Sequence, residues 1–222
     1  MKKIPTLFKR EFTDHVVTKV TPELSSPELA WVLSSDPREN GIATEKIDGA
    51  CCAIIDGVFC RRYDAKKNKK GQLKKPPAGA IPCDDLDPVT GHWPHWVKVS
   101  DKPADQWYRE AYRNSLVVLH AALPPGAECK LKDGTYEAVG PHFQGNPYNS
   151  GCDMLMKHGE IRLDLRDRSF EGIRDYLRET DIEGIVFWKG GEPKCKIKRR
   201  DFGFKWPTEE RMATDTEWSD NS

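Results

Sequence analysis

Short apolar runs separated by turn residues predict three β-hairpins along the 222-residue chain. Residues 50–55 and 58–63 flank Asp56-Gly57, and this dipeptide between two apolar runs is the strongest short-range hairpin signal. The same pattern places a second hairpin over 128–139, around Asp133-Gly134, and a third over 182–198, around Gly190-Gly191. Residues 12–20 also have strand-like content. The chain is therefore expected to form antiparallel sheets.

Helical periodicity is confined to a few segments. Phe170, Ile173, Tyr176 and Leu177 form one apolar stripe and predict a helix over 169–180. A second helix is expected over 103–114, and Ser26-Pro27 predicts a short one that begins there. The apolar run 116–123 suits either a helix or a strand. Together these elements predict an α+β fold of antiparallel sheets flanked by helices.

The charge distribution indicates that one segment of the chain, and not the protein as a whole, would attract an anion. The 35 basic and 35 acidic residues cancel, and 222 residues suffice for one substantial domain, expected over 1–207 and followed by an acidic, disordered tail over 208–222. Residues 61–75, however, carry eight basic side chains against one acidic side chain. This basic stretch opens a long irregular segment, 64–101. Such a segment suits a polyanion, although a solvated loop with no partner is an equal alternative.

The seven cysteines include no Cys-x-x-Cys pair, which argues against a zinc site. His92 and His95 have no further ligands near them in the sequence, so a metal site at this pair is rejected as well. An odd cysteine number without a signal peptide favours a reducing interior over a disulfide scaffold. The apolar runs are too short to span a bilayer. The protein is expected to be soluble, cytoplasmic, monomeric and without a membrane partner.

A candidate nucleophile lies in the run Thr44-Glu-Lys-Ile-Asp-Gly49. Lys46 stands at the end of a predicted strand, and Asp48-Gly49 forms a turn before the central hairpin. Desolvation and neighbouring cations both disfavour an ammonium ion, which is the condition for a nucleophilic amine. Taken alone, the run is also compatible with an ordinary turn and a solvated lysine.

Two further stretches suggest a nucleotide site. Glu137 leaves a strand into a Gly-Pro turn, where a carboxylate can accept hydrogen bonds from a ribose hydroxyl, although an exposed hairpin glutamate is the alternative. Lys194, Lys196 and Lys198 recur every second residue, so they share one face of a strand. Adjacent ammonium groups repel each other unless an anion lies between them, which favours a phosphate site over a solvated edge.

The motifs TEKIDG (44–49), YEAVGP (136–141), EGIVF (183–187) and KCKIK (194–198) resemble, in order, those of the covalent nucleotidyltransferase superfamily. The forms resemble most the ATP-dependent RNA ligases, in particular a small vertebrate-type 5′ to 3′ RNA ligase family. The resemblance covers about 44–207. It implies an ATP-grasp-like nucleotidyltransferase domain, here expected without the C-terminal oligonucleotide-binding barrel of DNA ligases and capping enzymes.

The resemblance also implies roles for individual residues. Lys46 would take up AMP, Lys196 and Lys198 would clamp the α-phosphate (with Lys194 an open alternative), and Glu137 would hold the ribose. Arg61 or Arg62 would contact phosphate or ribose, and Glu45 would also bind the nucleotide. Glu183 and Asp48 would place Mg²⁺, for which Mn²⁺ can substitute. The basic loop residues Lys66, Lys67, Lys69 and Lys70 would bind RNA.

The implied reaction joins a 5′-phosphate to a 3′-hydroxyl RNA end in three phosphoryl transfers, with ATP as the AMP donor, as in RNA repair. Three alternatives remain open from the sequence: a minimal DNA ligase, an RNA-end guanylyltransferase, and a non-catalytic nucleic-acid-binding protein of the same fold.

Overall fold

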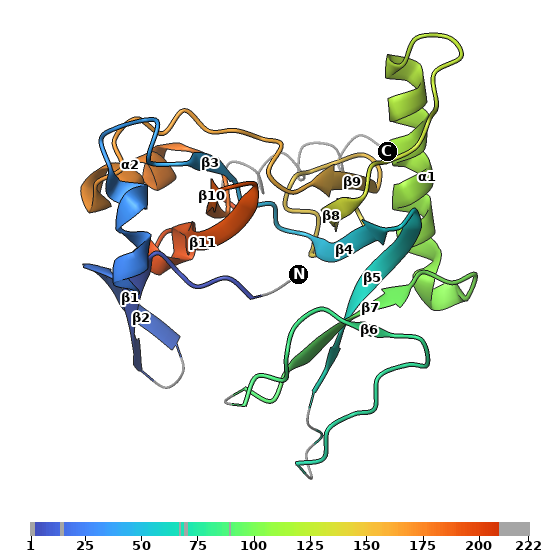
Figure 1. Cartoon of the computed structure of the whole chain (residues 1–222), viewed down its shortest axis with the longest axis horizontal. Helices are drawn as coiled ribbons and strands as arrows, with labels where there is room; N and C mark the ends of the chain where they lie inside the picture. Colours follow the sequence, from blue (N-terminus) through green and yellow to red (C-terminus); the bar gives the residue numbers. More distant parts are fainter. Residues whose placement is uncertain (1–2, 14–15, 67, 69–70, 89, 209–222) are drawn as a thin grey trace, which may run out of the picture. The chain divides into compact units, whose positions relative to one another are not determined.

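The structure is a computed structural model that describes residues 3–13, 16–66, 68, 71–88 and 90–208 (Figure 1). These residues divide into two compact units. Unit 1 comprises Lys3 and Asp48–Lys157, and unit 2 comprises Ile4–Ile47 and the chain from His158 onward. The single domain expected over 1–207 therefore stays a prediction, and the expected acidic tail lies, apart from Thr208, outside the described residues.

Unit 1 is built on a six-stranded antiparallel sheet in the order β6-β7-β5-β4-β8-β9. The hairpin predicted around Asp56-Gly57 lies at the centre of this sheet. Both turn residues have positive φ (50° and 72°), as a tight hairpin turn requires. The strands are β4 (Ala50–Ile55), β5 (Val58–Ala65), β6 (Ile81–Pro82), β7 (Trp93–Lys98), β8 (Gly134–Val139) and β9 (Met154–Lys157).

One face of this sheet packs on helix α1 (Gln106–Ala122), which follows the 3₁₀ turn η2 (Pro103–Asp105). Ala111 of α1 is buried against Cys52 and Tyr136 of the sheet. The helix predicted over 103–114 is confirmed. The apolar run 116–123, whose type was open, is the second half of the same helix.

The hairpin predicted around Asp133-Gly134 is wrong. Residues 128–132 form no strand, and β8 pairs with β4 and β9 instead. The Asp133 carboxylate accepts hydrogen bonds from the backbone N–H groups of Asp56 (2.9 Å) and Gly57 (3.0 Å). The sequence thus located a turn correctly, but this turn does not connect two paired strands. It stabilises the turn of the central hairpin instead.

The irregular segment expected over 64–101 contains two strands, β6 and β7. His95 of β7 is buried, and its Nδ1 lies 2.9 Å from the Trp93 carbonyl oxygen. The described residues contain no cluster of three or more His, Cys, Asp or Glu that could hold a metal ion.

Unit 2 contains a three-stranded sheet in the order β11-β10-β3 and a separate hairpin of β1 and β2. Its strands are β1 (Phe8–Thr13), β2 (Val16–Leu24), β3 (Ile42–Glu45), β10 (Gly184–Lys189) and β11 (Glu192–Lys198), and its helices are η1 (Pro27–Leu33), α2 (Phe170–Glu179) and η3 (Arg199–Phe202). The third predicted hairpin is β10–β11, and the strand content expected over 12–20 is divided between β1 and β2. The short helix predicted at Pro27 is the 3₁₀ segment η1.

Helix α2 begins as the sequence predicts. The Ser169 side chain caps it by accepting a hydrogen bond from the Gly172 N–H at 3.0 Å. Ile173 and Leu177 are fully buried in the core with Ile185 and Ile197 of the sheet. No helix among the described residues is long and apolar enough to cross a bilayer.

Replacing Leu177 by alanine is expected to lower the free energy of unfolding by about 2–5 kcal/mol, because the side chain is fully buried beneath the sheet of unit 2. Chemical denaturation measures this loss. Glu179→Ala, at an exposed position of the same helix, is the matched control, and an equal effect of the two substitutions would contradict the assigned core.

Candidate active site

The register of the unit 2 sheet gathers three of the predicted residues at one end. Gly184 of β10 pairs with Lys198 of β11, and on the other side its carbonyl oxygen accepts a hydrogen bond from the Lys46 N–H at 2.9 Å. Lys46 directly follows β3, as predicted. A lysine therefore lies on each side of the start of β10, next to Glu183.

Gly184 itself is required by this packing. A Cβ atom at this position would lie 2.3 Å from the Ile197 carbonyl oxygen and 3.0 Å from the Lys198 Cα. The bare glycine backbone lets β10 and β11 approach closely at the end of the sheet where the charged residues lie.

The Glu183 carboxylate is the centre of the cluster. Its side chain is 1% exposed; Oε2 pairs with Lys46 Nζ, and Oε1 lies 2.8 Å from Lys198 Nζ and 3.6 Å from Arg200 Nη2. Burial by itself would raise the pKa of Glu183, but the charges of Lys46 and Lys198 and the hydrogen bonds to them outweigh burial, so the pKa is lowered. The carboxylate is ionised and held among cations.

Lys196 lies on the same strand face as Lys198, because Cys195 and Ile197 between them point into the core and are fully buried. Burial, followed by the positive charges of Lys46 and Lys198, lowers the pKa of Lys196 to about 8. Among the described residues Lys196 has no ion-pair partner, whereas Lys194 pairs with Glu192. The three lysines thus share a face as predicted, and Lys196 and Lys198, not Lys194, belong to the cluster around Glu183.

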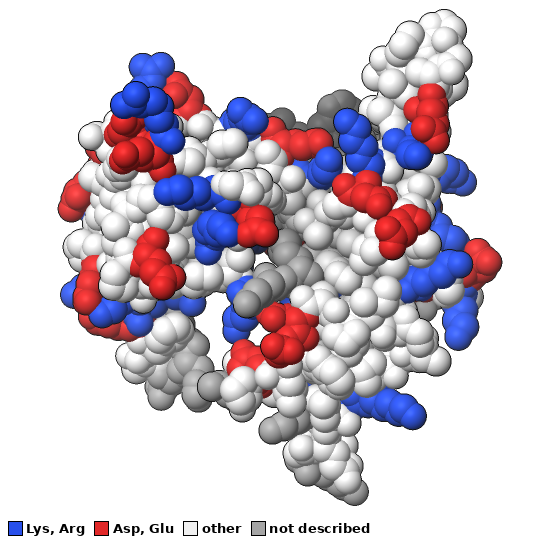
Figure 2. Space-filling view, in the orientation of Figure 1, with Lys and Arg blue, Asp and Glu red and all other residues white. Residues whose placement is uncertain are grey.

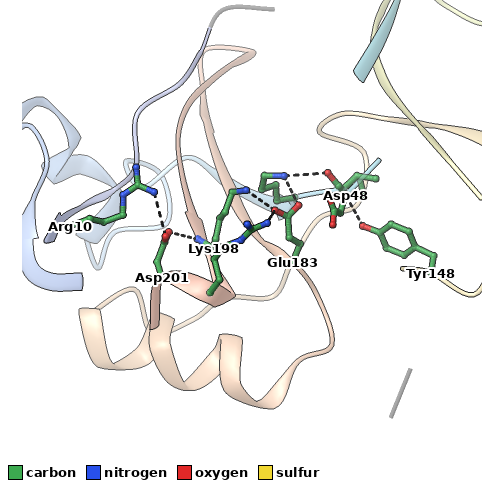
Figure 3. Close-up of polar contacts among 9 residues, drawn as sticks. Arg10, Asp48, Tyr148, Glu183, Lys198 and Asp201 are labelled. Carbon is green, nitrogen blue, oxygen red and sulfur yellow. Dashed lines mark hydrogen bonds and ion pairs between the residues drawn. The ribbon is translucent and has the colours of Figure 1, made fainter. Parts of the chain in front are cut away.

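A second buried carboxylate fixes the backbone beside the cluster. Asp201 of η3 accepts a hydrogen bond from the Lys198 N–H at 2.9 Å, and its Oδ1 lies 3.4 Å from Arg10 Nη1 (Figure 3). The N-terminal segment also runs beside β11, since the Leu7 N–H donates to the Lys196 carbonyl oxygen at 2.7 Å. The backbone of β11 at Lys196 and Lys198 is therefore held from both sides. The sequence alone gave no role to Asp201 or Arg200.

Glu183 alone does not supply a complete set of metal ligands. A magnesium ion is commonly bound by only one or two carboxylates, with waters and substrate phosphates as the other ligands. The buried Glu183 carboxylate fits such an ion only together with a phosphate group, since Lys46, Lys198 and Arg200 already surround it.

Glu137, Arg61, Arg62 and Asp48 belong to unit 1. Glu137 of β8 is 8% exposed and pairs across the sheet with Cys51, whose pKa burial raises to about 12, with Glu137 adding to this effect and Arg62 opposing it. Glu137, Cys51 and Arg62 therefore lie in one row on one face of the sheet.

Arg61 points to the other face. Its register partner is Cys52, which is buried against α1, and its Nε donates to the Asp105 carboxylate at 2.6 Å. Asp105 also accepts hydrogen bonds from the N–H and hydroxyl groups of Ser100 (2.9 and 2.7 Å). Arg61 thus anchors the start of α1. Of the two predicted arginines, Arg62 shares the face of Glu137.

Asp48 donates its backbone N–H to the Tyr148 hydroxyl group at 2.8 Å (Figure 3). The adjacent Gly49 lets the start of β4 pass close to β8, since a Cβ there would lie 2.4 Å from the Ala138 carbonyl oxygen. A metal-binding role for Asp48 stays a prediction.

The remaining predicted residues are only partly described. Glu45 ends β3, and its N–H donates to the Ile161 carbonyl oxygen at 2.9 Å. Lys66 is exposed, and Lys67, Lys69 and Lys70 lie outside the described residues. Acidic and basic side chains are interspersed over the face drawn in Figure 2, in keeping with a net charge of zero. RNA binding by the basic loop stays a prediction.

No protein-family model matches the chain. Among curated proteins, it is 27% identical to "RNA ligase 1" of Rattus norvegicus in a match that covers 76% of this chain and 69% of the rat protein. It is 25% identical to "RNA ligase 1" of Danio rerio in a match that covers 93% of this chain and 82% of that protein. "RNA ligase 1" of Mus musculus matches at 26% identity with 76% and 68% coverage. These similarities relate the chain to the RNA ligase family.

Proposed function

We propose that the chain is an ATP-dependent RNA ligase that works through a covalent lysyl-AMP intermediate on Lys46. The observation that carries the proposal is the surplus of positive charge at one end of the unit 2 sheet, where Lys46, Lys198 and Arg200 contact the Glu183 carboxylate and Lys196 lies beside them. Such a surplus suits a bound phosphate. The similarity to proteins named RNA ligase 1 supports RNA as the substrate.

In the first step the Lys46 Nζ attacks the α-phosphorus of ATP, an N–P bond forms, and pyrophosphate leaves with the electron pair of the broken P–O bond. The attack requires the neutral amine, so Lys46 must leave its ion pair with Glu183 and lose a proton. Lys196 and Lys198 neutralise the α-phosphate oxygens, on which negative charge is concentrated during the transfer.

Magnesium, when bound with the nucleotide, supplies further neutralisation of phosphate charge, and Glu183 is its protein ligand in this proposal. Displacement of Lys46 and Lys198 from Glu183 would free these two side chains for the phosphate. Before the nucleotide binds, Glu183 thus keeps Lys46 and Lys198 in place through its ion pairs with them.

In the second step a 5′-phosphate oxygen of the RNA displaces Lys46 and takes up AMP, so the N–P bond breaks and a P–O–P linkage forms. In the third step the oxygen of an RNA 3′-hydroxyl attacks the 5′-phosphorus and its proton passes to solvent. A phosphodiester O–P bond forms while the P–O bond to AMP breaks, and AMP leaves with that electron pair. On the family resemblance, Glu137, Arg62 and Glu45 remain the candidates for contacts to the nucleotide, Asp48 for the metal, and the loop around Lys66 for the RNA.

Mixing the protein with ATP and Mg²⁺ is expected to raise its intact mass by one adenylyl group, because Lys46 forms a stable bond to phosphorus. Lys46→Ala should abolish this adduct, measured by mass spectrometry. Lys194→Ala is the matched control, since Lys194 pairs with Glu192 outside the cluster and its loss should leave the adduct in place.

Three other outcomes would decide against parts of the proposal. An adduct from GTP but not from ATP would indicate a guanylyltransferase, and sealing of nicked DNA but not RNA would indicate a DNA ligase. Salt-sensitive nucleic-acid binding without any adduct would indicate a non-catalytic protein.

The affinity for AMP is expected to fall as the pH rises through about 8, because Lys196, with its pKa lowered to that value, is then no longer a cation that can bind the phosphate. One linked proton limits the fall to about tenfold per pH unit. Lys196→Arg should remove the dependence, since arginine stays charged. Titration calorimetry across this pH range measures it. Lys194→Arg should behave as the parent protein, and a flat profile in the parent would contradict the role of Lys196.

A further inference from the structure

A cavity of about 290 Å³ opens in unit 2 beside the cluster around Glu183. It lies between strand β2, helix α2 and the 3₁₀ segment η3. Phe170 and Phe202, whose rings meet edge to face with centroids 5.3 Å apart, form an apolar part of its wall. This volume suits a small group, since pockets for drug-sized ligands begin at about 300 Å³.

The charged part of the wall is positive. Lys19, Arg174 and Arg200 line the cavity, and the only carboxylate among its lining residues in the described chain is Asp201. Asp201 is 4% exposed and already engaged by the Lys198 N–H and Arg10. Lys19 is exposed and, within the described part of the chain, has no ion pair, whereas Arg174 shares the exposed Asp175 with Arg178. Apolar walls reduce solvent screening, so these cations attract an anion more strongly than on an open surface.

Arg200 connects the cavity to the candidate active site. Its guanidinium lies 3.6 Å from Glu183 Oε1, the oxygen that also pairs with Lys198, and the same residue lines the cavity. Arg200 is therefore shared between the candidate active site and the wall of the cavity that Lys19 and Arg174 also line.

We infer that this cavity binds the β- and γ-phosphates of the nucleotide and holds pyrophosphate as the leaving group. The inference rests on the proposed function, because the β- and γ-phosphates belong to the same ATP whose α-phosphate Lys46 is proposed to attack. Charge favours this ligand over the 5′-phosphate of an RNA end: three cations match the three or four negative charges of pyrophosphate, whereas a phosphate monoester carries at most about two. Lys19, Arg174 and Arg200 would share the charge that develops on the leaving group.

The test uses the full-length protein and inorganic pyrophosphate as the probe. In the double variant Lys19→Ala, Arg174→Ala, the affinity for pyrophosphate, measured by titration calorimetry, is expected to fall by about tenfold or more, since two charged contacts are lost. The affinity for AMP, which lacks these phosphates, should stay unchanged. In adenylylation the KM for ATP should rise, while the Lys46 adduct still forms at high ATP.

Arg178→Ala is the matched control, because it also removes a partner of Asp175 from α2 but lies outside this cavity. Unchanged pyrophosphate affinity in the double variant, or an equal loss in Arg178→Ala, would overturn the inference. So would a loss of affinity for 5′-phosphorylated RNA with pyrophosphate binding intact. Absence of any AMP adduct in the parent protein would refute the proposed function instead, and the pyrophosphate titration would still decide whether the cavity binds this anion.

Discussion

A carboxylate that is almost fully withdrawn from water is the constraint on which the candidate site depends. An ionised carboxylate in such a place is strongly unfavourable unless cations and hydrogen bonds surround it. Glu183 meets this requirement because the antiparallel register places Lys46 and Lys198 on either side of the next residue, Gly184. The sheet therefore holds the candidate nucleophile Lys46 and the candidate phosphate ligand Lys198 in one arrangement.

The same arrangement is unbalanced in charge. Lys46, Lys198 and Arg200 all approach Glu183, and Lys196 lies half-buried beside them without an ion pair of its own among the described residues. Burial, followed by repulsion from Lys46 and Lys198, lowers the pKa of Lys196, and a bound anion would relieve this repulsion. In the proposed function a phosphate chain supplies that anion, so the arrangement favours phosphoryl transfer over a purely structural salt-bridge network.

Local signals in the sequence predicted the parts of the fold that local physics determines. Asp56-Gly57 requires positive φ and forms its hairpin, and the cap of α2 at Ser169 depends on neighbours within three residues. Longer-range pairings were not predictable in this way. The Asp133 carboxylate binds the turn of a hairpin that lies 76 residues earlier in the chain. Only the cross-strand register shows that Arg61 faces Asp105, which leaves Arg62 as the arginine on the face of Glu137. The motifs located the main site residues, whereas the positively charged cavity depends on packing between β2, α2 and η3.

The central claim is that the amine held by Glu183 is the one that becomes bonded to phosphorus. Tandem mass spectrometry of peptides from protein mixed with ATP and Mg²⁺ tests this most directly, because it locates the adenylyl group on a single side chain. The account predicts AMP on Lys46 of the parent protein. AMP attached to Lys196, Lys198 or any other residue, with Lys46 unmodified, would contradict it.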